Sequence, residues 1–540
     1  MKRIFFVLVL CLMGGEGFAQ EAYPKDWLHL SFEQRNIHGI NSIAAYALLK
    51  GRTAKPVIVA VIDSGIDTDH EDLKEAIWVN PGEIAGDGKD NDNNGYIDDI
   101  HGWSFISGPE GDVDKDTYEL TRVYKSLKEK YEGKTEAEAT DKDEFRFFKE
   151  IEEKYQQALN DAMRTGMTAI GFYRAYERFN RLLLAYVGKS TDDELTMEDV
   201  QAIESEDEMI QQAQGLMAYV IQNNYGEEKI KEYMEYAQNK LKYNLNLDFD
   251  GRAIVGDDYQ NLSERSYGTN RIKGPDAQHG THVAGIIAAI RGNEKGIDGV
   301  ADQVKIMVLR AVPGGDERDK DIANAIYYAV DNGARVINMS FGKAYSPQKE
   351  AVDKAMLYAA QKGVLLVHAA GNEAKNTENE PSYPTEETLT GQRISTWMEI
   401  GASSWKANEE LPADFSNYGQ RVDVFAPGVD IYATVPDNGY EALSGTSMAA
   451  PVVSGLAALL MSYFPELSAL EVKKIILDSA TPLKKQMVIK PGSEAAEEET
   501  EEGEAEAKPE LVKFKELSRV GGVVNAHQAV LLALKKSKKK

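Results

Sequence analysis

The sequence predicts an α/β protein of three layers (α/β/α), with a mostly parallel central sheet and an all-α insertion. Short apolar runs rich in Val, Ile and Ala alternate with helical patterns along most of the chain, which is typical of a parallel sheet covered on both faces. Residues 109–250 differ, because they are dense in Glu, Lys, Tyr and Gln at helical spacing and contain no proline between Glu110 and Asp250. The two textures predict one large domain that several amphipathic helices interrupt.

The first segment, residues 1–20, has the pattern of a secretion signal. Lys2 and Arg3 precede the apolar run Ile4–Met13, and small residues that suit a cleavage point follow. A buried strand or helix is the alternative for such a run. The only cysteine, Cys11, lies in this segment, which excludes a disulfide framework. We expect an exported protein, secreted or periplasmic, since no later run reaches the roughly 20 apolar residues of a membrane span.

The elements of the sheet follow in chain order. Apolar runs predict buried strands, and the helical patterns between them end at glycines, as many helices do. The strands are expected at Pro56–Ile62, Val304–Leu309, Val336–Met339, Val364–Val367 and Val422–Phe425. Two clear helices are expected at Ile322–Asn332 and Lys349–Lys362, before Gly333 and Gly363.

The chain divides into a main domain and additions. The acidic addition is expected to be a solvated loop, because Glu494–Glu510 holds nine Glu and one Lys. The expected parts are the main domain at 21–108 and 251–534, the helical insertion at 109–250, the acidic low-complexity loop at 485–515 and a basic tail at 535–540.

The charge of the chain is strongly negative. Lys and Arg number 61 and Asp and Glu 88, a formal net charge of −27, which argues against a nucleic-acid partner. The helical insertion, with 32 acidic and 19 basic residues, contributes −13 of this charge, and residues 491–510 contribute −8. The acidity therefore belongs mainly to the two additions.

Two segments offer an acid and a base. The run Val61–Asp67 (VIDSGID) places the Asp63 carboxylate at the carboxyl end of a buried strand, where α/β proteins bind ligands. The run His279–Gly285 (HGTHVAG) predicts a helix that begins at His279 and packs closely on the sheet through small residues. A capping Asp, and a metal-binding pair of His279 with His282, are the alternatives. No third metal ligand stands nearby, so we expect His282 to be a packed or hydrogen-bonded neighbour.

A third segment offers a nucleophile. In Ser444–Pro451 (SGTSMAAP), Ser447 stands at the start of a helix, where backbone N–H groups and the helix dipole favour an anion. A capping serine is the alternative. Together, Asp63, His279 and Ser447 are the parts of a serine-hydrolase triad, in an order that differs from that of the α/β hydrolases. Asn372 follows a buried strand, so its amide N–H can point at a developing oxyanion.

The combination of D-S-G-I-D, H-G-T-H-V-A-G and G-T-S-M-A-A-P resembles the subtilisin-like serine peptidases, the subtilase family. The resemblance covers about residues 50–108 and 251–481 and resumes at Gly521–Leu534. It implies the fold of that family and endopeptidase activity on proteins or peptides through an acyl-enzyme intermediate. In the implied roles Ser447 attacks, His279 transfers the proton, Asp63 holds the His tautomer, and Asn372 with the Ser447 N–H binds the oxyanion.

The resemblance also implies residues that bind substrate. One stretch lines the cleft as an edge strand, and a second borders the pocket for the residue before the cut. These stretches are Ser340, Phe341 and Gly342, and Gly401, Ala402 and Ser403.

The loop Asp87–Asp99 is crowded with oxygen ligands. Its alternating Asp and Asn residues and Gly95 match the first half of a calcium loop, although the final glutamate of an EF-hand is missing. A charged surface loop rich in Asx turns is the alternative. We expect a structural Ca²⁺, as many subtilases bind. The expected ligands are Asp90, Asp92, Asn94, Asp98 and Asp99.

Two features depart from the family pattern. Between the signal and Asp63 only about 40 residues are present, so no inhibitory propeptide is evident. Asp63 and His279 are 216 residues apart because the helical insertion intervenes, and we expect it to emerge near the cleft. It is expected to gate substrate entry or to bind a partner, with a decoration of no catalytic role as the alternative. For the whole chain, a non-catalytic binding protein and an esterase are the competing hypotheses.

Overall fold

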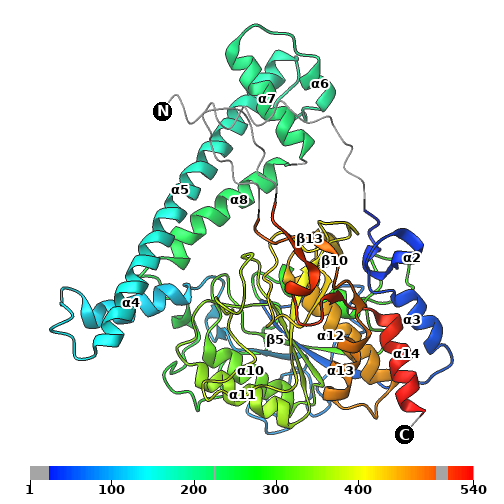
Figure 1. The fold of residues 1–540 in the computed structure, drawn as a ribbon. Coiled ribbons are helices and arrows are strands. Elements are labelled where there is room, and N and C mark those ends of the chain that lie inside the picture. The colour runs from blue at the N-terminus through cyan, green and yellow to red at the C-terminus, as the bar shows by residue number, and fades with distance from the viewer. Residues whose placement is uncertain (1–22, 224, 494–508, 539–540) are drawn as a thin grey trace. The chain divides into compact units, whose positions relative to one another are not determined.

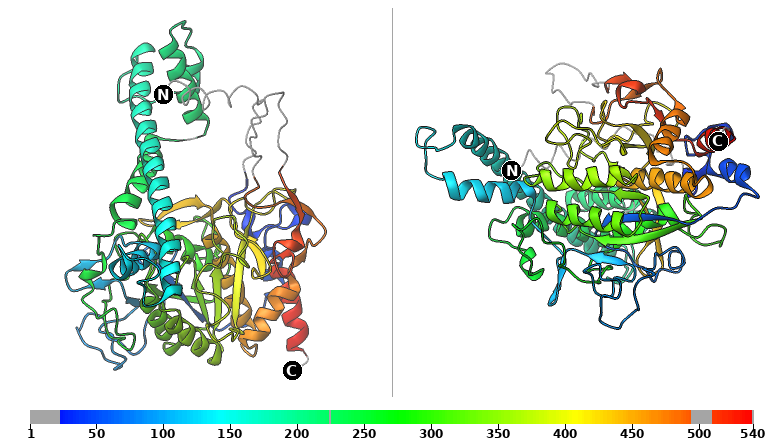
Figure 2. Two further views of the ribbon diagram at one scale, coloured as in Figure 1. Left: turned by 60° about the vertical axis from the view of Figure 1, so that its left-hand side comes forward. Right: turned by 90° about the horizontal axis from the view of Figure 1, so that it is seen from below.

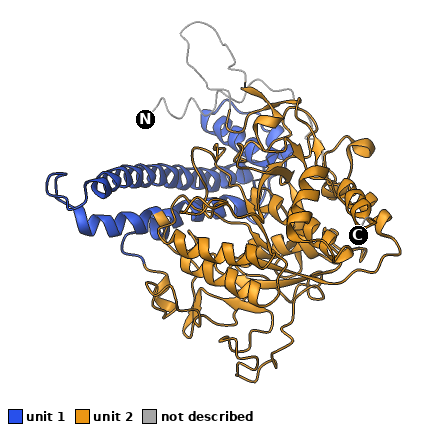
Figure 3. Cartoon of the chain, turned by 60° about the horizontal axis from the view of Figure 1, so that its bottom comes forward, with its two compact units in different colours: residues 1–22, 120–249 blue, residues 23–119, 250–540 orange. Residues whose placement is uncertain are grey.

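Figure 1 shows the computed structural model, which describes residues 23–223, 225–493 and 509–538. The predicted secretion signal and residues 494–508 of the acidic segment lie outside the described residues. The chain divides into two compact units (Figure 3). Leu120–Phe249 is the described part of the first, which we call the helical unit. Tyr23–Glu119 and Asp250–Lys540 make up the second, which we call the sheet unit.

The sheet unit is built on nine strands, and all neighbours in the sheet are parallel except β12 and β15. Strand β1 lies between β5 and β6, so the two halves of the sheet diverge from it. Such a switch point opens a crevice at the carboxyl ends of the strands. In spatial order the strands are β12 (Thr481–Pro482), β15 (Gly522–Val523), β9 (Val424–Pro427), β8 (Trp397–Ser403), β7 (Leu365–Ala369), β6 (Val336–Met339), β1 (Val57–Asp63), β5 (Val304–Arg310) and β2 (Gly102–Ser104).

Helices cover both faces of this sheet (Figure 2). Along β1 the side chains alternate, with Val59 and Val61 in one core and Ala60 and Ile62 in the other. This arrangement confirms the predicted α/β class with a mostly parallel sheet. The first core contains α3 (Ser42–Leu49), α9 (Gln278–Ala288), α12 (Thr446–Tyr463), α13 (Ala469–Ser479) and α14 (Ala526–Ser537), and the second contains α10 (Asp319–Asp331) and α11 (Lys349–Gln361).

The predicted strands match β1, β5, β6, β7 and β9 with small shifts at their ends. Strand β8 was not predicted, because Glu399 interrupts its apolar run. That glutamate is buried, where its carboxylate accepts a hydrogen bond from Trp397 Nε1 (2.9 Å) and lies 3.2 Å from His368 Nδ1. A polar residue inside a central strand therefore hid the strand from an analysis of apolar runs.

The helical unit is dominated by one helix of 45 residues, α5 (Lys142–Tyr186). Asp141 caps it by accepting from the N–H groups of Asp143 and Glu144. The first half of α5 packs aromatic side chains against α4, as in the stacked pair Tyr124 and Tyr155. The second half forms an apolar core with the remaining helices, α6 (Met197–Gln201), α7 (Glu208–Gln222) and α8 (Glu227–Asn239). A π-helical turn, Lys240–Asn244, follows α8, and α4 spans Glu119–Tyr131.

The smaller elements of the sheet unit include several hairpins. The described ends of the acidic segment pair as β13 (Met487–Ile489) and β14 (Leu511–Lys513), and α14 reaches into the expected basic tail. Among the described residues, α12 is the one helix long and apolar enough to cross a membrane, and 89% of it is buried inside the sheet unit. The others are η1 (Trp27–His29), α2 (Phe32–Arg35), β3 (Ser107–Gly108), β4 (Gly111–Asp112), η3 (Arg252–Ile254), β10 (Ile431–Val435), β11 (Gly439–Leu443) and η4 (Phe514–Glu516).

Candidate active site

Asp63 ends strand β1 at the switch point of the sheet. Its buried Oδ1 lies 2.7 Å from His279 Nδ1 and accepts from the Ser64 N–H at 2.8 Å. Gly65 has a φ of 131°, and a Cβ there would lie 2.0 Å from the Lys273 carbonyl oxygen, so the turn after the strand requires glycine. The local sequence thereby fixes the carboxylate at the edge of the sheet where a ligand can bind.

His279 is the second residue of α9, and this helix approaches β1 closely. A Cβ on Gly280 would lie 2.2 Å from the Gly65 carbonyl oxygen, so only glycine permits the approach. The His279 side chain is 38% exposed and faces both Asp63 and the solvent. Burial lowers the pKa of His279, but the charge and hydrogen bond of Asp63 and the charge of Asp276 raise that pKa further, above its usual value of 6.5.

His282, one turn later on α9, is buried rather than open to a ligand. Its Nε2 lies 3.1 Å from the Glu441 carbonyl oxygen, and burial lowers its pKa to about 4. The burial of this imidazole and its bond to the backbone of β11 agree with the expected packed, hydrogen-bonded neighbour.

Ser447 is the second residue of α12, at the expected helix start. Its Oγ donates to the Ser340 carbonyl oxygen at 3.2 Å, and Ser340 Oγ in turn donates to the Ser447 carbonyl oxygen at 2.9 Å. Among the described residues Ser340 is the only hydrogen-bond partner of the Ser447 hydroxyl, so the contact between nucleophile and base is not made in this state. A serine hydroxyl can rotate, and such contacts often tighten only when substrate binds.

Asn372 follows β7 and is held by the residue beside the nucleophile. Its Oδ1 accepts from the N–H (2.8 Å) and Oγ1 (3.0 Å) of Thr446, which directs its Nδ2 away from Thr446. A Cβ built on Gly445 would lie 3.6 Å from Asn372 Nδ2 and 3.7 Å from the Ser447 backbone nitrogen. Both nitrogens therefore lie near Gly445, and two N–H donors close to a nucleophile are what an oxyanion needs.

Asn417 is a supporting residue that the sequence analysis missed. Its Nδ2 donates to the Ala370 carbonyl oxygen and to Glu373 Oε2, both at 2.8 Å, and its Oδ1 accepts from the Lys375 N–H at 2.8 Å. These bonds hold both sides of Asn372 in the loop after β7. An asparagine in a loop 45 residues later gives no signal of this role in the sequence.

A cavity of about 300 Å³ adjoins the candidate catalytic pair. Besides Asp63 and His279, two stretches of the chain line it, Ser340–Gly342 and Gly314 with Gly315. Glu317 also lines it, and burial raises the pKa of this carboxyl to about 8. The structure thus brings the predicted residues Ser340, Phe341 and Gly342 together with the catalytic pair.

The second predicted substrate stretch is not part of this cavity. Gly401, Ala402 and Ser403 are the last three residues of β8, where the strand pairs with β9. The Ala402 N–H donates to Ser416 Oγ, and a Cβ on Gly401 would lie 2.9 Å from the Phe425 ring. Contacts with β9 and with core side chains hold these residues, and their place at the rim of a substrate pocket stays a prediction.

The acidic loop Asp87–Asp99 brings carboxylates together, although not the predicted set. Carboxylate oxygens of Glu83, Asp90 and Asp92 lie within 4.8 Å of one another. Glu83 Oε1 accepts from the N–H groups of Asn91 and Asp92, while its Oε2 is buried and has no hydrogen-bond partner among the described residues. Three convergent carboxylates, one with an unused oxygen, suit a hard cation such as Ca²⁺.

The other predicted ligands use their side chains within the protein. Asp98 accepts from the N–H groups of Gly86 and Gly88, both at 2.9 Å. Both of its carboxylate oxygens thus bind the backbone of the loop. Asp99 is buried and accepts from Tyr328, Asn80 and Asn94. The amide of Asn94 is likewise used in this network. Glu83 was missed because it stands outside the loop in the sequence.

Comparisons with known proteins agree with the motifs. The model of the Subtilase family matches residues 54–492. Similar proteins include the thermophilic serine proteinase of Bacillus sp. (strain AK1), 42% identical over 40% of this chain and 48% of that protein, and subtilisin DY of Bacillus licheniformis, 39% identical over 38% and 71%. Thermitase of Thermoactinomyces vulgaris is 40% identical over 34% and 61%. The chain thus spans about half of the first relative and less than two thirds of thermitase.

Proposed function

The chain belongs to the subtilase family, and we propose that it is an exported serine endopeptidase that hydrolyses proteins or peptides through an acyl-enzyme. The observation that carries the proposal is the pairing of buried Asp63 with partly exposed His279 at one sheet edge, together with the two nitrogens of Asn372 and Ser447 that lie near Gly445. The N-terminal pattern of basic and then apolar residues supports export.

In the proposed reaction Ser447 Oγ turns from Ser340 toward the substrate and attacks the scissile carbonyl carbon. His279 Nε2 takes the hydroxyl proton, while Asp63 holds Nδ1–H and stabilises the imidazolium that forms. The carbonyl oxygen becomes an oxyanion that accepts hydrogen bonds from Asn372 Nδ2 and the Ser447 N–H. His279 then gives the proton to the leaving amine. A water molecule releases the acyl group by the same steps, which restores Ser447.

Calcium is proposed as a structural ligand of the loop that follows β1. Glu83, Asp90 and Asp92 would hold the ion, which would neutralise their mutual repulsion. Asp98 and Asp99 stabilise the loop through hydrogen bonds of their own. The ion has no part in the catalytic steps.

The test is labelling by a fluorophosphonate probe, which reacts with an activated serine. We expect the wild type to be labelled and Ser447→Ala to lose both labelling and peptidase activity, by about 10⁶-fold in kcat, the loss known for the nucleophile of subtilisin. Ser462→Ala is the matched control, because this serine lies on the same helix and its hydroxyl donates to the Leu459 carbonyl oxygen, away from the site. Labelling that persists in Ser447→Ala would contradict the site.

The two competing functions give different results in the same experiment. A non-catalytic scaffold would not be labelled, and it would have no need for all four groups of the site. An esterase would be labelled but would leave casein and a peptide library uncut. We expect labelling together with cleavage of both protein substrates.

A further inference from the structure

The segment that leads into the helical unit lies along the edge of the cleft. We call Asp112–Glu119 the outgoing stem; all of it belongs to the sheet unit. Lys115 forms a parallel β-bridge with Gly314, and the Gly314 N–H donates to the Asp114 carbonyl oxygen at 2.8 Å. Asp114 and Gly314 both line the cavity beside His279. The stem therefore extends one edge of the cleft by a strand-like contact.

The same stem also reaches the other stretch that lines the cleft, Ser340–Gly342, through a buried ion pair. Lys343 directly follows the cleft residues Ser340–Gly342, and its Nζ lies 2.8 Å from Glu119 Oε2. The same Nζ lies 2.8 Å from Asp319 Oδ1 and from the Glu317 carbonyl oxygen. The side chains of Lys343 and Glu119 are 1% and 4% exposed. The Lys343 ammonium group thus has three oxygen neighbours, one for each of its N–H donors. Each contact holds the segment after β6 against another part of the sheet unit.

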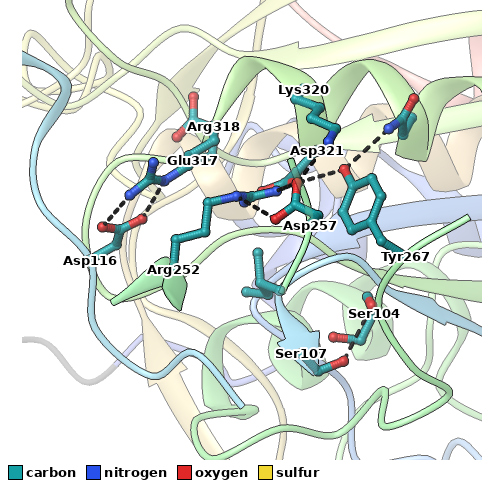
Figure 4. Close-up of polar contacts among 12 residues, drawn as sticks. Ser104, Ser107, Asp116, Arg252, Asp257, Tyr267, Glu317, Arg318, Lys320 and Asp321 are labelled. Atoms are coloured by element: carbon teal, nitrogen blue, oxygen red, sulfur yellow. Dashed lines mark hydrogen bonds and ion pairs between the residues drawn. The ribbon is translucent and has the colours of Figure 1, made fainter. Parts of the chain in front are cut away.

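Between these two contacts the stem is tied to the loop before α10. Asp116 accepts two hydrogen bonds from Arg318, at 2.7 and 3.0 Å (Figure 4), and the Glu119 N–H donates to Asp316 Oδ2 at 2.8 Å. Bidentate pairs of this kind fix orientation as well as distance. Contacts therefore hold the stem along its length, from the bridge between Lys115 and Gly314 to the ion pair between Glu119 and Lys343.

We propose that the outgoing stem joins the two edges of the cleft and sets their separation, with Glu119 and Lys343 as positioning residues for the acyl side of the substrate. This inference rests on the proposed peptidase function. An extended peptide between two strand edges needs them about 9.6 Å apart, twice the strand spacing. A displacement of about 1 Å can cost 10²-fold in rate, so a fixed separation matters. Buried ion pairs add little to stability, but removing one partner disturbs geometry.

The test compares a long and a short substrate in the full-length chain. The long substrate carries four residues on the acyl side of the scissile bond, and the short one is an ester of a single acylated amino acid, which does not reach the two edges. We expect Glu119→Gln to lower the ratio of kcat/KM for the long substrate to that for the short one about tenfold, through a higher KM. The double variant Glu119→Gln/Lys343→Met removes this pair, and Asp319 keeps the hydrogen bonds that it accepts from Ser346 Oγ and the Gln348 N–H, so the variant is expected to fold and to lower the ratio similarly.

Asp353→Asn is the matched control. It breaks another buried pair, Lys349 with Asp353, which lies in α11 and does not touch the cleft edges. We expect it to lower the melting temperature without changing the ratio, since a merely structural loss affects both substrates equally. An unchanged ratio in Glu119→Gln and in the double variant, while the short ester is still hydrolysed by Ser447, would overturn the inference alone. A chain that hydrolyses neither substrate and takes no fluorophosphonate label would overturn the proposed function and this inference with it.

Discussion

The two units of the chain use charged residues in opposite ways. In the sheet unit, ion pairs lie in the interior: Arg252 pairs with Asp257 and Asp321, whose side chains are fully buried (Figure 4). In the helical unit, pairs such as Arg164 with Asp161 lie on the surface of α5. A buried pair is costly to desolvate and fixes geometry, whereas an exposed pair contributes little. The comparison indicates that buried ion pairs help to fix the geometry of the sheet unit around its apolar cores, whereas the helical unit depends on its apolar faces.

The re-entry of the chain into the sheet unit shows how dense the interior network is. Asp321 accepts from Arg252 and from the Tyr267 hydroxyl, and Lys320 lies 2.7 Å from Asp257 (Figure 4). Lys320 also lies 2.8 Å from Glu264. Every one of these residues follows the helical unit in the chain. The charges of the sheet unit that directly follow the helical unit in the chain are thus compensated within the sheet unit itself.

The largest effect is expected from Arg252→Met, which removes the cation shared by two buried carboxylates. We expect a loss of about 3–5 kcal/mol in the free energy of unfolding, because Asp321 remains buried without this cation, while Asp257 keeps Lys320. Denaturant titration followed by circular dichroism measures it. Arg421→Met, an exposed arginine of the same unit, is the control and should change little. A loss below about 1 kcal/mol would show that the interior network does not specify the fold.

The next effect tests catalysis in the same unit and leaves the fold intact. Asn372→Ala removes one of the two N–H donors beside Ser447, and we expect kcat to fall about 10²–10³-fold, the range known from the matching residue of subtilisin. KM should change little, since the donor acts on charge that develops in the transition state. Asn376→Ala, in the same loop, is the control. A similar loss in both variants would assign the effect to the loop and not to the donor.

The sequence predicts the strands and site residues that a local pattern defines. It does not predict the contacts between residues that are far apart in the chain. Apolar runs identified β1, β5 and β6, but the buried Glu399 concealed β8. The catalytic candidates were visible because each stands in a short motif, whereas Glu83 joins the acidic loop only through the fold. Glu119 and Lys343 are 224 residues apart, and no local spacing can pair them.

A smaller effect is expected in the pH profile of the wild type and of Asp276→Asn. Because the pKa of His279 lies above its usual 6.5, kcat/KM should rise with pH through a value above 6.5, as the imidazole becomes the neutral base. Asp276 is one of the charges that raise this pKa. Its loss lowers the pKa, so Asp276→Asn should keep a larger share of its maximal rate at pH 6. Asp26→Asn, an exposed site elsewhere, should match the wild type, and an equal profile for Asp276→Asn would contradict the assignment.

The smallest effect is expected from Arg164→Ala on α5 in the helical unit. Its pair with Asp161, at 3.0 Å, joins side chains that are 79% and 52% exposed, and solvent screens it. Alanine is the best helix former, so the helix itself loses nothing. The melting temperature should therefore stay within about 1 °C of the wild type, and peptide hydrolysis should be unchanged. Differential scanning calorimetry and a peptide assay measure both. A loss comparable with that of Arg252→Met would mean that exposed charges also specify the helical unit, and the contrast between the two units would fail.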